Sequence, residues 1–132
     1  MCQVGDIILI SEFKDLNGEE VGLHPFIIVD DQTDKIKSLE LEFDLLGSML
    51  GSFHDKSHKQ EVLKKEENIQ VARKDGVAKD GYIKSDCLHY FRRKEIEHHV
   101  IGRIREDLFN LLLDHLEKYE EDGTLSYNLS NL

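Results

Sequence analysis

The sequence predicts an α+β fold, a small and mostly antiparallel β-barrel packed by one C-terminal amphipathic helix. Short apolar runs rich in β-branched residues recur up to residue 104 and are separated by turn signals such as Asn17-Gly18 and Asp75-Gly76. From Glu106 onward, leucines recur instead at the helical period. The length of 132 residues suits one domain with a continuous core.

The first part of the chain is expected to hold two buried strands joined by a loop. Residues 7–10 (IILI) have the length and branching of a buried strand. Residues 14–23 predict a loop, since they are acidic and contain a hairpin signal. Residues 25–29 (PFIIV) predict the second strand, with its proline at the strand start, where no ladder donor is lost. His24 would then stand at the mouth of that strand.

The middle of the chain alternates strands with polar segments. Residues 39–45, beginning with Leu39, alternate apolar and acidic side chains and predict a half-buried strand, which the glycine-containing residues 47–53 continue. Residues 54–68 are rich in lysine and glutamate and predict a short exposed helix or a long ordered loop. Residues 69–72 predict another strand.

Residues 81–91 (GYIKSDCLHYF) predict the strand around which the candidate site is organised. Residues two apart share a face of a strand, so Tyr82, Lys84 and Asp86 point one way while Ile83 and its alternating neighbours point into the core. A phenol, a cation and a carboxylate side by side can hold and polarise a phosphodiester. The alternative is a solvated strand face whose ion pair is worth less than about 1 kcal/mol.

The last part of the chain predicts a basic run, a strand and a helix. Residues 92–94 (RRK) are basic, and residues 100–104 (VIGRI) predict the last strand. The helix begins at Glu106, whose carboxylate suits the positive end of the helix, and ends by Gly123. Its apolar stripe comprises Leu108, Leu111, Leu112, His115, Leu116 and Tyr119. Residues 1–122 are therefore expected to form a single domain, followed by a polar tail over residues 123–132.

Charge and cysteine content restrict the class of protein. The 17 Lys and Arg against 27 Asp and Glu give a net charge of −10, which opposes nucleic-acid binding unless the basic residues cluster. The two cysteines have no C-x-x-C spacing, which indicates neither a disulfide framework nor a cysteine zinc site and fits a reducing cytoplasm. The N-terminus lacks a basic signal-peptide region, and no apolar run is long enough to span a membrane.

Several short motifs follow one another in a recognisable order between residues 4 and 117. They are Gly5-Asp6-Ile7, His24-Pro25 with the apolar strand, Leu50-Gly51-Ser52, Gly81-Tyr82-Ile83-Lys84-Ser85-Asp86, and Ile101-Gly102-Arg103-Ile104 before the leucine-rich helix. In this order they resemble the MazF/PemK-type toxins, the endoribonucleases of bacterial toxin–antitoxin pairs. The resemblance implies an SH3-like barrel and a homodimer whose protomers build an RNA channel together.

The chain departs from that family at three positions. The family has arginine before the proline, threonine in the following strand and arginine in the Gly-x-x-Arg-x-Asp strand, whereas this chain has His24, Gly51 and Lys84. Lysine cannot make the bidentate phosphate contact of a guanidinium. Histidine, with an ordinary pKa near 6.5, can instead act as general acid or base. Catalysis would therefore use a rearranged set of residues.

The resemblance implies attack of a ribose 2′-OH on the adjacent phosphate of single-stranded RNA, without metal or other cofactor, leaving a 2′,3′-cyclic phosphate. His24 is assigned to proton transfer, Lys84 to the phosphate charge, Asp86 to orienting either of them, and Ser52 to a hydrogen bond on the phosphate. The expected RNA-binding residues are Tyr82, His89, Arg92, Arg93 and Lys94. A cognate antitoxin would present carboxylates to this surface.

Other interpretations compete with this one. His54 and His58 have the i,i+4 spacing of two metal ligands, and His98-His99 could add more, but no further ligand completes a site, so exposed histidines are the simpler interpretation. The lost arginine and threonine also suit a catalytically degenerate barrel that binds RNA or protein. A third alternative is an unrelated small-barrel scaffold in which Lys84 and Asp86 are surface residues.

Overall fold

The computed structural model describes residues 2–132 and confirms a mixed α+β fold with a mostly antiparallel sheet. The strands are β1 Asp6–Lys14, β2 Glu20–Asp30, β3 Asp34–Ile36, β4 Leu41–Phe43, β5 Leu45–Ser52, β6 Asn68–Val71, β7 Gly81–Lys84, β8 Cys87–Phe91, β9 His98–Arg103 and β10 Ser126–Asn128. The helices are α1 Lys56–Leu63 and α2 Glu106–Glu121, with short 3-10 turns η1 Arg73–Asp75 and η2 Arg93–Glu95.

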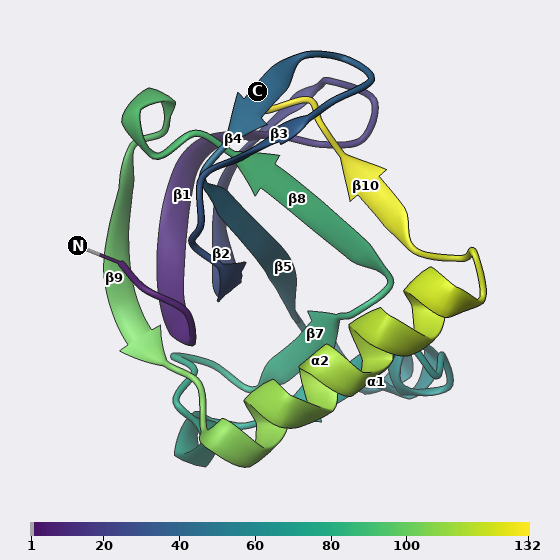
Figure 1. Cartoon of the computed structure of the whole chain (residues 1–132). Helices are drawn as coiled ribbons and strands as arrows, with labels where there is room; N and C mark the ends of the chain where they lie inside the picture. The colour runs from purple at the N-terminus through teal and green to yellow at the C-terminus, as the bar shows by residue number, and fades with distance from the viewer. Residues whose placement is uncertain (1) are drawn as a thin grey trace.

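The main sheet has eight strands and is curved, and α2 lies across one end of it (Figure 1). Its order is β10-β8-β5-β2-β1-β9, and β7 pairs with both β5 and β6. Strand β5 is shared, because Leu45–Gly47 pair with β8 while Leu50–Ser52 pair with β7. Over residues 2–132 these pairings do not close into a ring, so the predicted barrel is not confirmed. Strands β3 and β4 form a separate hairpin.

Strands β1 and β2 form the predicted hairpin, but both are longer than expected. Lys14 pairs with Glu20, so the loop between them is only residues 15–19. Pro25 lies in the middle of β2, opposite Leu9, and not at the strand start as predicted. Pairing with β5 begins only at Phe26, so β2 has a single neighbour at Pro25 and the missing N–H costs one ladder bond at most.

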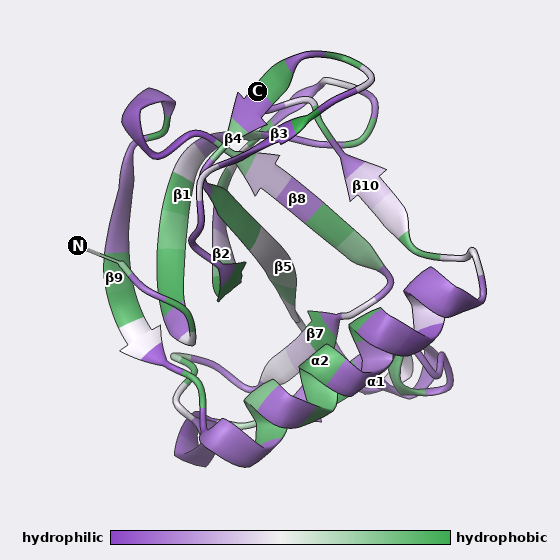
Figure 2. Cartoon of the chain, viewed as in Figure 1, coloured by the Kyte–Doolittle hydropathy of each residue, from purple (hydrophilic) through white to green (hydrophobic). Residues whose placement is uncertain are grey.

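The buried residues form two clusters on opposite faces of the central strands. The helix-side core comprises Ile7, Ile27, Leu50, Ile69, Val71, Val77, Ile83, Leu88, Ile104, Leu112, Leu116 and Leu125. The aromatic core comprises Cys2, Ile8, Ile10, Phe13, Phe26, Ile28, Leu45 and Phe91. Neighbours along a strand enter different cores, as side chains of a strand must alternate. In Figure 2 the strands β1 and β5 are correspondingly apolar along much of their length.

Helix α2 confirms the predicted C-terminal amphipathic helix. Leu112 and Leu116 are buried against the sheet, while Leu111 on the predicted stripe is 39% exposed because it lies at the edge of the contact. In Figure 2 apolar and polar segments alternate along α2, as one buried face requires. The helix ends before Gly123, which takes a positive φ of 71°.

Three local predictions differ from the structure. Residues 81–91 form two strands and not one, because a turn at Ser85-Asp86 separates β7 from β8. Residues 39–45 contain only the short β4, and Leu39 is 55% exposed in the turn before it. The segment predicted as a polar tail contains β10, which pairs in parallel with β8 and buries Asn128 completely.

The described residues contain no helix that is both long enough and apolar enough to cross a membrane.

Candidate functional site

A cavity opens where β2 and β5 diverge. The two strands pair from Phe26 and Met49 onward but not at Leu23–Pro25 and Leu50–Ser52, so a space of about 570 Å³ remains between them. Its lining comprises Ile7, Leu9, Leu23, His24, Pro25, Met49, Leu50, Gly51, Ser52, His54, Val71, Val77, Ala78, Lys79, Tyr82 and Ile101. Most of these side chains are apolar, and the polar ones are two histidines, a serine, a lysine and a tyrosine.

The cavity brings together three of the predicted site residues, His24, Ser52 and Tyr82. They come from β2, β5 and β7, which the sheet order places side by side. The His24 ring is half-buried and packs edge-on against Phe13, with ring centroids 5.6 Å apart. Phe13 is in turn part of the aromatic core, so the position of His24 depends on that core.

Gly51 is explained by the tyrosine opposite it. Gly51 pairs with Tyr82, and a Cβ at position 51 would lie 2.4 Å from the Tyr82 ring and 2.6 Å from its hydroxyl oxygen. A side chain at this position is therefore incompatible with the ring where it lies. The Tyr82 hydroxyl occupies the space that a residue-51 side chain would fill.

Lys84 and Asp86 form the expected pair but do not line the cavity. The Lys84 Nζ lies 3.6 Å from Asp86 Oδ1, and the two side chains are 37% and 30% exposed. An exposed pair of this kind contributes at most about 1 kcal/mol to stability. Asp86 therefore contacts Lys84, which is one of the two partners predicted for it.

His89 is buried and unavailable for the predicted stacking on RNA. It is 4% exposed and packs against Phe13 and Phe26, each with its ring centroid 5.2 Å away. Its Nδ1 lies 2.9 Å from Asn128 Nδ2, which also donates to the Lys14 carbonyl, so Nδ1 is the acceptor. Burial, together with the nearby charges of His24 and Lys84, lowers the pKa of His89 from 6.5 to about 4.

The basic run of Arg92, Arg93 and Lys94 lies away from the cavity, beyond the far end of β8 (Figure 1). Both of its guanidinium groups are already engaged. Arg92 bonds to Glu95 at 3.1 Å, and Arg93 donates to the Cys2 carbonyl at 2.9 Å. The structure therefore does not bring this run together with His24 and Tyr82.

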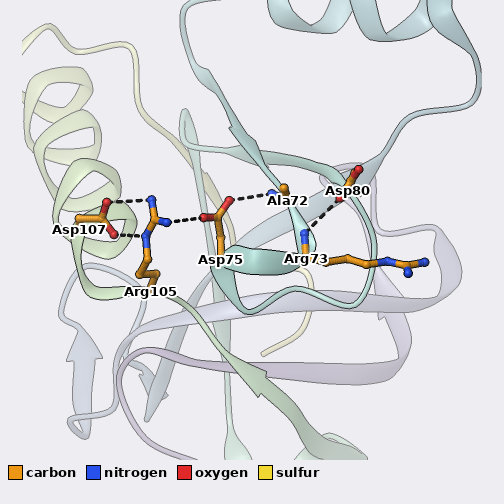
Figure 3. Close-up of polar contacts among 6 residues, drawn as sticks. All are labelled: Ala72, Arg73, Asp75, Asp80, Arg105 and Asp107. Atoms are coloured by element: carbon orange, nitrogen blue, oxygen red, sulfur yellow. Dashed lines mark hydrogen bonds and ion pairs between the residues drawn. The ribbon is translucent and has the colours of Figure 1, made fainter.

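One wall of the cavity is a loop that an ion-pair network attaches to α2 (Figure 3). Arg105 bridges Asp107, through an N–O distance of 2.5 Å, and the buried Asp75, at 3.0 Å. The other Asp75 oxygen accepts from the Ala72 backbone N–H at 2.8 Å. Gly76 follows with a φ of 109°, and a Cβ there would collide with the Arg103 carbonyl at 1.9 Å. This anchoring holds Val77, Ala78 and Lys79 against the cavity.

Sequence reasoning missed Phe53 and Lys59 beside the cavity, and it considered His54 and His58 only as metal ligands or exposed histidines. The Phe53 ring lies 5.7 Å from Tyr82, and the His58 ring lies 6.5 Å from Tyr82. The His54 and His58 rings pack at a tilt of 41° with centroids 4.3 Å apart, and Lys59 Nζ lies 5.3 Å from the centre of the Phe53 ring. The only signal for Phe53 and Lys59 in the sequence was their position soon after Ser52, whereas His54 and His58 were marked by their i,i+4 spacing.

The histidine pair is not part of a metal-ligand cluster, since no group of three or more His, Cys, Asp or Glu suited to a metal ion occurs in the part of the chain that the structure describes. Comparison with protein-family models and with curated proteins gave no match to this chain.

Proposed function

We propose that this protein is a metal-independent endoribonuclease that cleaves single-stranded RNA, and that its site is the cavity between β2 and β5. The proposal adopts the toxin–antitoxin function and the SH3-like barrel that the motif order implies. The observation that carries it is the presence of two histidines, His24 and His54, in the lining of one cavity. Cleavage by the ribose 2′-OH requires a base and an acid, and histidine serves as either near neutral pH.

In this mechanism His24 removes the proton of the 2′-OH as its oxygen attacks the phosphorus. The bond from phosphorus to the 5′-oxygen breaks, and His54 in its protonated form donates a proton to that oxygen. The products are a 2′,3′-cyclic phosphate and a 5′-OH. Lys79, Ser52 and the Tyr82 hydroxyl line the same cavity and would stabilise the charge on the phosphorane oxygens. Lys84, paired with Asp86, would attract the neighbouring phosphate.

The experiment is cleavage of single-stranded RNA in excess EDTA, with the products analysed for cyclic-phosphate ends. His24→Ala should lower the rate by about 10²–10⁴-fold, the usual contribution of a positioned proton-transfer group, and His54→Ala should have a comparable effect. His99→Ala is the matched control, since His99 is exposed and outside the lining. Loss of cleavage when EDTA is added, or full cleavage activity in His24→Ala, would contradict the proposal.

The cognate antitoxin and the homodimer belong to the same proposal. Expression of the chain alone should arrest growth of a bacterial host, and a partner protein encoded next to it should relieve the arrest. Light scattering at tens of micromolar should give the mass of a two-fold dimer. Growth without arrest, together with a monomeric mass, would count against the toxin function even if RNA is cleaved.

The second candidate is a binding module that has lost catalysis. It is favoured by one observation, the absence of any arginine from the cavity lining of the described residues. Under this alternative the protein binds RNA or a protein partner without cleaving RNA, so cyclic-phosphate ends never appear. His24→Ala then changes only the affinity for that partner.

A further inference from the structure

Aromatic and cationic side chains gather at one side of the cavity, where β5 leads into α1. We call this group the Phe53 platform and define it as Phe53, His58, Lys59 and Tyr82. Their contacts form a continuous chain, because Phe53 and His58 each pack near Tyr82 and Lys59 lies over the Phe53 ring. Phe53, His58 and Tyr82 are partly exposed and Lys59 is exposed, so each of the four residues keeps surface that a ligand can reach.

The polar contacts of this segment fix the orientation of His58. Asp55 caps α1 by accepting from the His58 backbone N–H at 2.8 Å. The His58 Nδ1 accepts from the His54 backbone N–H at 3.1 Å, so the proton of the neutral ring is on Nε2. The ring therefore presents a hydrogen-bond donor on its far side.

The segment beside the platform lacks the acidic excess of the whole chain. Residues 54–68 contain four lysines and four carboxylates, whereas the complete protein has a net charge of −10. The cavity next to this segment contains Lys79 and no Asp or Glu in its lining. In a chain with 27 acidic residues, a cavity without carboxylates next to a helix that carries Lys56 and Lys59 is suited to an anionic ligand.

The combination of stackable rings and lysines narrows the class of ligand. Proteins that bind single-stranded nucleic acid stack bases on aromatic side chains and place cations along the backbone. A base stacked on Phe53 or Tyr82 would leave its phosphate beside Lys59 and the ring of His58. The other basic run of the protein is less available, because Arg92 and Arg93 already bond to Glu95 and to the Cys2 carbonyl.

We infer that the Phe53 platform is the base-stacking site for single-stranded RNA, holding a nucleotide next to the one whose phosphate lies in the cavity. This inference rests on the proposed function for the identity of the ligand. It replaces the run at residues 92–94 as the principal RNA-binding surface. It also gives the histidines of residues 54–65 separate roles, proton transfer for His54 and RNA contact for His58.

The test measures fluorescence anisotropy of a labelled 2′-O-methyl RNA octamer, which cannot be cleaved because its 2′-oxygens are blocked. Phe53→Ala should weaken binding about tenfold, the effect of removing one stacking ring, whereas Phe53→Tyr should bind like the unchanged protein. Lys59→Ala should weaken binding about threefold and reduce the dependence of log K on log salt by about one unit. Circular dichroism of each variant checks that it is folded.

The matched control is Lys94→Ala, which removes the same charge from an exposed lysine in the distant run. It should leave the affinity within about twofold of the starting value. The inference is overturned if Lys94→Ala weakens binding as much as Lys59→Ala, or if Phe53→Ala binds as well as the unchanged protein. It is also overturned if only an acidic peptide, and not the RNA, binds in a manner that depends on Phe53.

The two proposals fail in different ways. Binding that depends on Phe53 and Lys59 without any cleavage of unmodified RNA would remove the endoribonuclease and retain the platform. Cleavage that depends on His24, with binding insensitive to Phe53, would do the reverse.

Discussion

The helix-side core and the aromatic core lie on opposite faces of the same central strands but are built from different chemistry. The helix-side core is aliphatic, with Leu112 of α2 completely buried in it. The aromatic core packs phenylalanine rings against His89, which is hydrogen-bonded to Asn128, and these two polar residues are 4% and 0% exposed. On the helix side the hydrogen bond between the buried Ser85 and His115 joins a turn to α2, whereas in the aromatic core the hydrogen-bonded histidine itself packs among the rings.

The candidate site is in contact with both cores. His24 contacts the aromatic core through Phe13, whereas Leu50, Val71 and Val77 of the cavity wall belong to the helix-side core. The position of His24 therefore depends on the aromatic core, and the shape of the cavity depends on the helix-side core. Substitutions in the two cores should separate these contributions.

The largest effect is expected from Leu112→Ala. It removes a completely buried side chain from the helix-side core, which typically costs about 2–5 kcal/mol in the free energy of unfolding. Urea unfolding measures this loss. The neighbouring Leu113 is 39% exposed, so Leu113→Ala is the control and should change stability by less than about 1 kcal/mol. Equal losses in both variants would contradict the assignment of the buried face of α2.

Acid should destabilise the protein through the aromatic core. The unfolded chain protonates His89 near pH 6.5, whereas the folded protein resists protonation until about pH 4. Between these values the unfolded state binds more protons, so stability falls as the pH is lowered through this window, by up to about 3 kcal/mol.

The measurement is urea unfolding at pH 7 and pH 4.5 for the unchanged protein and for His89→Gln, whose side chain does not titrate and can still accept from Asn128. The difference between the two pH profiles isolates the histidine from the many carboxylates. Parallel profiles would show that His89 is not a source of acid sensitivity.

A smaller and local effect is expected where the loop of the cavity wall meets α2. Arg105→Ala leaves the 6% exposed side chain of Asp75 without its cation, at a cost of about 1–3 kcal/mol for a buried charged group, partly relieved as the loop opens to water. Amide exchange of Val77 and Ala78 should accelerate more than that of the core strands. Arg73→Ala is the control, because the Arg73 side chain points away from this network in Figure 3. Unchanged exchange in Arg105→Ala would mean that the wall does not depend on this ion pair.

Much of the fold follows from local patterns. The β-branched runs predicted β1, β6 and the apolar part of β2, and the leucine period predicted α2, because these patterns report which side chains are buried. The turn at Ser85-Asp86 was not predicted, because the apolar residues on either side of it were assigned to one strand although Lys84, Ser85 and Asp86 are three polar residues in a row. Strand β10 was not predicted either, because its ordering depends on Asn128 reaching His89 and Lys14, which are distant in the sequence.

The candidate site was predicted less completely than the fold. Motif order singled out His24, Ser52 and Tyr82, which the structure places in one cavity. His89 was misassigned to the surface because alternation within β8 does not show that β10 covers its edge. The Phe53 platform gave no periodic signal, since it is formed where a strand end, a short helix and a neighbouring strand meet.

The hydrogen bond from Asn128 to the Lys14 carbonyl joins residues that are 114 positions apart. During synthesis, the β1–β2 hairpin, which contains Phe13 and His24, is therefore made long before Asn128, which bonds to the last residue of β1. Contacts of such large sequence separation form slowly. Until β10 pairs with β8, His89 lacks the hydrogen bond that Asn128 donates to its Nδ1. The apolar residues of the aromatic core all lie within residues 2–91, so the growing chain should pack them first and fix the ring of His89 only when residue 128 arrives.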